Sequence, residues 1–145
     1  MGLLFKYSLT DAWHIPFSEI AVFDNDPGYV FYWAKGKDQF APLLEQESID
    51  LDEATLKKIR ELISEISVTK VETLEHVIVL DGYIQEFSYK LDGREAEFSG
   101  YNLACCKEQP KLYPNAMTML RLLQKLKDIL APMGVDKNCF ALSRR

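Results

Sequence analysis

The stretch from His76 to Asn102 constrains the fold more than any other part of this chain. It contains three short runs of strand-like residues, and the dipeptides Asp81-Gly82 and Asp92-Gly93 separate these runs. Asp-Gly is typical of two-residue hairpin turns, because both central residues of a type I′ turn adopt positive φ angles. The spacing therefore predicts three antiparallel strands joined by two tight turns.

Counting outward from Asp92-Gly93 predicts the residue pairs across the second hairpin. The pairs on one face are mostly apolar: Leu91 with Arg94, Tyr89 with Ala96 and Phe87 with Phe98. The pairs on the opposite face are polar: Lys90 with Glu95, Ser88 with Glu97 and Glu86 with Ser99. A shift of one residue would mix the buried and the solvated sets, so the alternation favours this register.

The same count through Asp81-Gly82 gives the sheet a second apolar surface. It places Val77 and Val79 on the outer face, beside Ile84 and Tyr101. Because both faces of the sheet would then be apolar at this end, both faces need to be covered there. Cover from the same chain is the simpler interpretation, and a surface for another protein or for a second copy is the alternative.

The N-terminal third is predicted to form strands rich in aromatic residues. An alternating run over residues 3–9 leads into a loop over residues 10–18. Residues 19–23 and 29–34 are β-branched or aromatic, and the Asp, Asn, Pro and Gly residues at 24–28 predict a turn between them. Because residues 29–34 have aromatic side chains on both faces, we expect this strand to lie centrally or under other cover.

Two segments have the 3.6-residue period of amphipathic helices. The first is expected to begin at Asp50, with Glu53 completing a capping box, and to extend for about four turns. The second is predicted over residues 115–130 and has the wider apolar stripe. The stripe residues are Leu56, Ile59, Ile63 and Ile66 in the first helix, and Ala116, Met119, Leu120, Leu123, Leu126 and Leu130 in the second.

These elements favour a single α+β domain over residues 1–145. We expect a two-layer structure in strand-helix-strand-helix order, in which an antiparallel sheet of five or six strands packs one face on two helices. Part of the other face would be exposed or covered by the loop over residues 10–18. With 145 residues and 48% hydrophobic residues, the chain is long enough for one sizeable core.

Charge and cysteine content restrict the partners and the compartment. The chain has 17 basic and 22 acidic residues, a formal net charge of −5, which argues against binding to nucleic acid or to an anionic membrane and is compatible with a basic partner. The N-terminus does not resemble a signal peptide, and no apolar stretch is long enough to span a membrane. Three cysteines form no even disulfide framework. We therefore expect a cytoplasmic protein with free thiols.

No motif in the sequence predicts a catalytic, metal or nucleotide site. Cys105 and Cys106 are adjacent, so in an extended chain their side chains would point to opposite faces and could not share one zinc ion. Residues 24–26 lack the later Gly and Glu that a calcium loop needs. His14 and His76 have no evident nucleophile or carboxylate partner. We accordingly predict no metal, no cofactor and no catalytic residue.

The aromatic residues of the N-terminal third are the remaining candidates for function, although packing in the core would also explain them. Amphipathic aromatic side chains are enriched at protein interfaces and in ligand clefts. The preferred hypothesis is a non-catalytic protein-binding or regulatory module, whose partner is another protein or a second copy. The alternative is a small-molecule-binding domain or an enzyme with a site near the Trp13-His14 loop. The candidate binding residues are Trp13, His14, Tyr32, Trp33, Val79, Ile84 and Tyr101.

Overall fold

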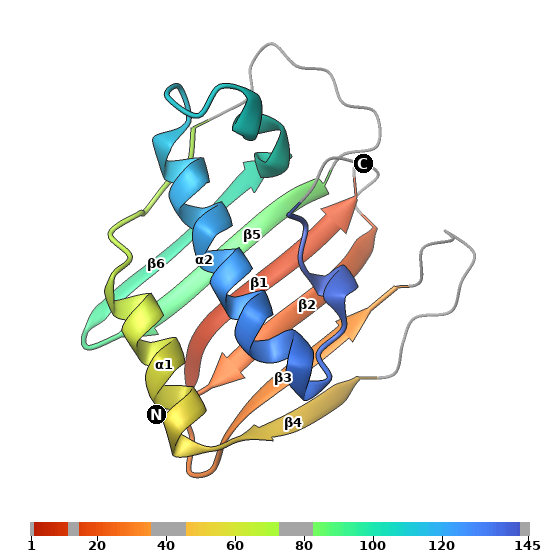
Figure 1. Cartoon of the computed structure of the whole chain (residues 1–145), viewed down its shortest axis with the longest axis vertical. Helices are drawn as coiled ribbons and strands as arrows, with labels where there is room; N and C mark the ends of the chain where they lie inside the picture. Colours follow the sequence, from red (N-terminus) through yellow and green to blue (C-terminus); the bar gives the residue numbers. More distant parts are fainter. Residues whose placement is uncertain (1, 12–14, 36–45, 73–82, 143–145) are drawn as a thin grey trace.

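The computed structural model describes residues 2–11, 15–35, 46–72 and 83–142 (Figure 1). Within these residues, strands form one six-stranded antiparallel sheet in the order β4-β3-β2-β1-β5-β6. The strands are β1 (Leu3–Asp11), β2 (Pro16–Phe23), β3 (Gly28–Ala34), β4 (Glu47–Leu51), β5 (Tyr83–Leu91) and β6 (Arg94–Tyr101). The helices are α1 (Glu53–Ser64), α2 (Pro114–Leu130) and the short 3-10 helices η1 (Leu103–Glu108), η2 (Ala131–Met133) and η3 (Lys137–Cys139).

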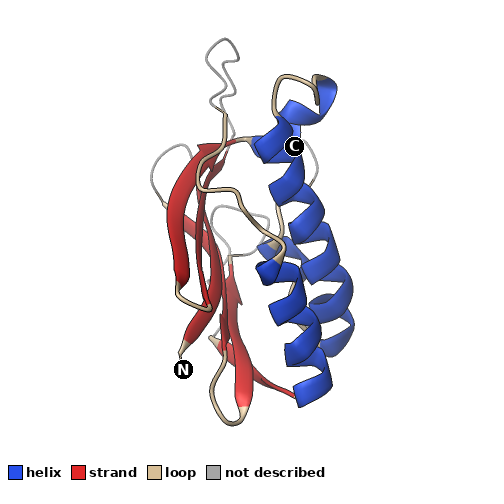
Figure 2. Ribbon diagram, turned by 90° about the vertical axis from the view of Figure 1, so that its left-hand side faces the viewer, coloured by secondary structure: helices blue, strands red, loops and turns tan. Residues whose placement is uncertain are grey.

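The two long helices lie on the same face of the sheet, as the edge-on view in Figure 2 shows. No helix of the described residues lies on the opposite face, which we call the open face. The predicted α+β class and antiparallel sheet are thus confirmed. The predicted strand-helix-strand-helix order is matched only in part, because three 3-10 helices accompany α1 and α2.

The hairpin at Asp92-Gly93 forms as the sequence predicts. Asp92 and Gly93 have φ angles of 51° and 79°, the positive values that a type I′ turn needs. All six predicted residue pairs between β5 and β6 are present, from Leu91 with Arg94 to Glu86 with Ser99. The rings of Phe87 and Phe98 stack with their centroids 5.2 Å apart.

The predicted pairing of residues 76–80 with the strand after Asp81-Gly82 is wrong. From Ile84 to Tyr89, β5 pairs with β1 along one edge and with β6 along the other, so both of its edges are occupied. Alternation within residues 76–91 could not reveal this, because the true partner strand lies about 80 residues earlier in the chain. Residues 76–82 themselves lie outside the described residues.

The predicted loop over residues 10–18 is also wrong for its described part. Thr10 and Asp11 belong to β1, and residues 16–18 belong to β2. The Asp11 side chain accepts a hydrogen bond from the Ile15 amide at 2.9 Å, and the Asp11 amide donates one to the Ile15 carbonyl at 3.0 Å, so two hydrogen bonds join these residues. Pro16 is the first residue of its strand, a position that needs no ladder donor. The next hairpin, between β2 and β3, forms as predicted, with Phe23 opposite Tyr29.

Helix α1 begins two residues later than predicted. Asp52 is the N-cap residue, and its carboxylate accepts a hydrogen bond from the Thr55 amide at 2.7 Å. Asp50 belongs to β4 and pairs with Tyr29 of β3. Strand β4 has only five residues and is too short and too polar to recognise in the sequence. At the other end of α1, the Arg94 guanidinium donates hydrogen bonds to backbone oxygens, including that of Ser64 at 2.9 Å.

The first turn of α2 is capped by a residue distant in the sequence. The Glu72 carboxylate accepts hydrogen bonds from the amides of Asn115 and Ala116, at 3.0 and 3.1 Å. These amides belong to the four at a helix start that have no partner within the helix, and a negative charge there also interacts favourably with the helix dipole. The N-cap residue, Tyr113, contributes no side-chain cap of its own.

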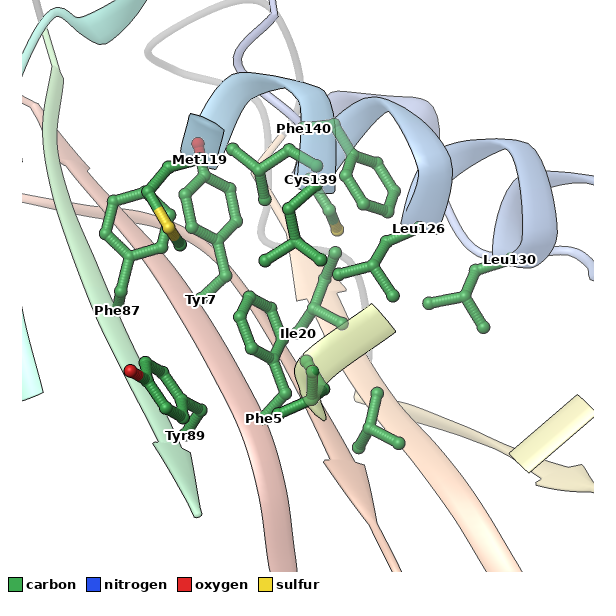
Figure 3. Close-up of a cluster of buried hydrophobic side chains, with 14 of the residues drawn as sticks. Phe5, Tyr7, Ile20, Phe87, Tyr89, Met119, Leu126, Leu130, Cys139 and Phe140 are labelled. Carbon is green, nitrogen blue, oxygen red and sulfur yellow. The ribbon is translucent and has the colours of Figure 1, made fainter. Parts of the chain in front are cut away.

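The predicted stripes of both helices form the core against the sheet. Figure 3 shows Leu126 and Leu130 of α2 on the same side of the sheet as Phe5, Tyr7 and Ile20 of the central strands. All ten predicted stripe residues are buried.

Replacement of Leu123, which is fully buried, tests the core. We expect Leu123→Ala to lower the free energy of unfolding by about 2–5 kcal/mol, because it removes apolar contacts and leaves a cavity. Urea denaturation measures this loss. Lys125→Ala, at an exposed position on the same helix, should change stability by less than about 0.5 kcal/mol. Equal effects of the two substitutions would contradict the packing described.

The cap that Glu72 provides at the start of α2 leads to a second prediction about stability. Glu72→Ala should lower the free energy of unfolding by about 1 kcal/mol, the usual loss when a helix cap is removed. Thermal unfolding measures the change, with Glu61→Ala on the exposed side of α1 as the matched control. If the loss were no larger than that of the control, Glu72 would have no capping role.

Candidate functional site

The structure places four of the seven candidate binding residues. Trp33, Ile84 and Tyr101 lie on the open face, whereas Tyr32 lies on the helix face. This division follows from strand geometry, because successive side chains point to opposite faces. Trp13, His14 and Val79 lie outside the described residues, and so does the alternative site near the Trp13-His14 loop.

Paired residues in an antiparallel sheet share a face, so the register gives rows of side chains across the strands. Three of these rows cross the central strands on the open face. They consist of Asp50, Tyr29, Phe23 and Leu3; of Ser48, Phe31, Ala21, Lys6, Ser88 and Glu97; and of Trp33, Glu19, Ser8, Glu86 and Ser99.

The half of the open face over β2 and β3 is aromatic. We define the aromatic patch as Phe23, Tyr29, Phe31 and Trp33. All four side chains are partly exposed, and none belongs to the hydrophobic core that packs under the helices. The rings of Phe23 and Tyr29 stack with their centroids 4.8 Å apart. These residues therefore hold apolar surface on the side of the sheet away from the core.

The half of the open face over β1, β5 and β6 is polar and mainly acidic. Lys6 pairs with Glu19 at 3.1 Å, and farther along the sheet Lys90 lies 4.0 Å from Glu95. Glu86 and Glu97 are exposed and have serines as their cross-strand neighbours.

Ile84 and Tyr101 form a partly exposed apolar pair at one end of this half.

Two shallow hollows lie on or beside the polar half. One, of about 220 Å³, is lined on the open face by Leu3, Ser88, Lys90, Glu95 and Glu97. The other, of about 370 Å³, lies at the sheet end. Pockets that enclose small ligands measure about 300–1,000 Å³ and are mostly apolar. The smaller hollow is better suited to a single side chain than to a cofactor.

Tyr32 has a structural contact rather than a place on the open face. Its hydroxyl donates a hydrogen bond to the Gly134 carbonyl at 3.0 Å, which fastens the segment after α2 to the sheet. Partial burial, together with the nearby Glu47 carboxylate, raises the pKa of Tyr32. The hydroxyl thus remains a donor at neutral pH.

A buried polar network inside the core is absent from the sequence predictions. The Gln85 amide nitrogen donates a hydrogen bond to the Tyr7 hydroxyl at 2.6 Å, and its carbonyl oxygen accepts one from the Leu103 amide at 2.7 Å. Burial raises the pKa of Tyr7 far above its ordinary value, so the hydroxyl stays neutral. Gln85 is 1% exposed, and its bonds offset the cost of burying an amide. This network joins β1 and β5 to the start of η1.

The three cysteines are free thiols, and two of them are buried. Burial raises the pKa of Cys106 to about 11 and that of Cys139 to about 12. The Cys139 thiol lies 3.5 Å from the Trp33 carbonyl oxygen, to which it donates a weak hydrogen bond. In the described residues, no three His, Cys, Asp or Glu side chains are grouped so that they could hold a metal ion.

Comparison with known proteins does not extend these observations. No protein-family model matches the sequence, and no curated protein shows significant similarity to it. Among the described elements, neither α1 nor α2 combines the length and the apolar character that crossing a bilayer requires.

The raised pKa values of the two buried thiols lead to a prediction about cysteine reactivity and about the pH dependence of stability. In the folded protein at pH 8, only Cys105 should react rapidly with a disulfide reagent, because Cys106 and Cys139 are buried and protonated. The unfolded thiols ionise near pH 9, so the stability gained from burying neutral thiols is present below pH 9. It is lost as the pH rises through 11 to 12.

Thiol release measured with and without denaturant checks this prediction. Cys105→Ser should abolish the rapid phase and leave two thiols that react only after unfolding. A rapid phase that persists in Cys105→Ser would show that a buried thiol is accessible.

Proposed function

We propose that this protein is a non-catalytic protein-binding module that contacts its partner through the open face of the sheet. The observation that supports this most is the alternation of Tyr29, Phe31 and Trp33 on the side opposite the helices. Aromatic side chains have a large apolar area and little entropy to lose, and they dominate binding energy at protein interfaces. Exposed apolar patches on soluble domains commonly mark such interfaces.

The size of the open face agrees with this role. Five strand spacings of about 4.8 Å and eight residues of about 3.4 Å give an area of roughly 650 Å². A typical protein–protein interface buries about 800 Å² on each partner. The open face could therefore supply most of one interface, with Trp33 in the aromatic patch and Ile84 and Tyr101 near the opposite end.

The proposal includes the organisation and location of the protein. We regard the whole chain as one two-layer domain, because the buried side chains of both helices and of the central strands form a single cluster. We place it in the cytoplasm, since the free Cys105, Cys106 and Cys139 fit a reducing compartment.

Substitution within the aromatic patch tests the binding role. The double variant Phe31→Thr/Trp33→Thr removes two rings but keeps residues that favour strands. Leu112→Thr is the matched control, because Leu112 is 62% exposed and lies outside the sheet. In affinity capture from the native cells, we expect the control to retain a stoichiometric protein partner and the double variant to lose it, with both variants folded by circular dichroism. Capture of the same proteins by both variants would contradict the proposal.

A further inference from the structure

We infer that the partner of the open face is a basic polypeptide segment, whose apolar side chains rest on the aromatic patch while its Lys or Arg side chains reach Glu86 and Glu97. This inference rests on the proposed function and adds the charge and the layout of the partner. It depends on the distribution of charge over the open face.

Glu86 and Glu97 are the carboxylates that the polar half of this face leaves available. The Lys6 ammonium is 3.1 Å from Glu19, and the Lys90 ammonium is 4.0 Å from Glu95. Within the described residues, Glu86 and Glu97 form no ion pair, and the residues opposite them in the ladders are serines. Cross-strand neighbours on diagonal positions lie about 7–8 Å apart, so two cations of one partner could contact both carboxylates.

The rows set the spacing that such a partner must have. Trp33 and Glu86 occupy the same row three strands apart, a separation of about 14 Å. Phe31 and Glu97 occupy the next row four strands apart, about 19 Å. A helix of about ten residues spans 15 Å, and an extended segment needs about five residues. One short segment lying across the strands can therefore contact both halves.

The surface between the two halves permits this contact. Ser8 is the small side chain next to Glu86 in the first row, and Ser88 is the one next to Glu97 in the second. Lys6, the cation in the second row, is already paired with Glu19 of the first row. The hollow of about 220 Å³ beside Glu97 gives a long cationic side chain room to approach the carboxylate. At the opposite edge of the aromatic patch, the exposed Asp50 faces Tyr29 and adds a further negative charge.

A second copy of this chain fits the open face less well. It would bring the same carboxylates, and each copy has a formal net charge of −5. Like charges that meet at an interface disfavour association. Lys6 and Lys90, two cations on the described part of this face, each lie beside a carboxylate of their own sheet. The same repulsion applies to nucleic acid and to anionic membranes.

Selection from a displayed library of random 12-residue peptides tests the inference. The immobilised wild-type protein is the target, and peptides that also bind Phe31→Thr/Trp33→Thr are removed. We expect the retained peptides to combine Lys or Arg with aromatic or aliphatic residues. Their affinity should fall about fivefold to tenfold for Glu86→Gln/Glu97→Gln at low salt, the loss of two exposed ion pairs, and should weaken as salt is added.

Glu61→Gln/Glu65→Gln, on the exposed side of α1 and at its C-terminal end, is the matched charge control and should leave the affinity unchanged. Retained peptides without positive charge, or an affinity unaffected by Glu86→Gln/Glu97→Gln, would overturn the inference while the proposed binding face stands. If no peptide distinguishes the wild type from Phe31→Thr/Trp33→Thr, both the inference and the proposed function fail. A dimer in sedimentation that Phe31→Thr/Trp33→Thr dissociates would identify a second copy as the occupant and would also overturn the inference.

Discussion

The antiparallel pairing of β1 with β5 is the interaction on which the rest of this structure depends. It joins the N-terminal strands β1 to β4 to the later β5–β6 hairpin and so makes one six-stranded sheet. It places Tyr7 opposite Phe87, with the ring centroids 5.1 Å apart, and brings Gln85 within reach of the Tyr7 hydroxyl. The same register aligns the rows of the open face, because Ser8 lies opposite Glu86. Without this ladder there would be neither a common core nor a continuous outer surface.

Helix capping reinforces the arrangement through contacts between distant segments. The Glu72 carboxylate serves the start of α2, and Arg94, next to the β5–β6 turn, serves the end of α1. In both cases the helix end obtains its partner from another element. The start of α2 and the end of α1 are therefore fixed by distant segments, whereas the start of α1 has the local cap Asp52.

Local patterns in the sequence predicted the local structure well. Asp92-Gly93 determined both the turn and every pair of its hairpin, because a type I′ turn allows one register. The helix stripes were correct, since burial on one side imposes a 3.6-residue period. The predictions failed where a distant partner decides the outcome. Asp81-Gly82 has the same composition as Asp92-Gly93, yet β5 pairs with β1, and β4 has too few apolar residues to stand out.

The candidate surface could be predicted only in part, for the same reason. Trp33, Ile84 and Tyr101 were selected from the sequence, and they share the open face. Tyr29 and Phe31 belong to the aromatic residues considered in the N-terminal third but were not named as binding residues, and Phe23 was not considered. The alternation within residues 29–34 and the turn before it nevertheless place all three beside Trp33. Tyr32 was selected for its aromatic character alone, and it lies on the helix face. The polar Gln85 network had no signal, because a buried glutamine among apolar residues looks like an ordinary interruption.

The distance in sequence between β1 and β5 also affects how the chain is made. During synthesis, β1 to β4 leave the ribosome before β5, so the inner edge of β1 has no partner until residue 91 has emerged. An unpaired strand edge readily joins other chains, and distant contacts form slowly. Lys6, in the middle of β1, places a charge on this strand during that interval. A charged residue on a waiting edge is a common protection against aggregation.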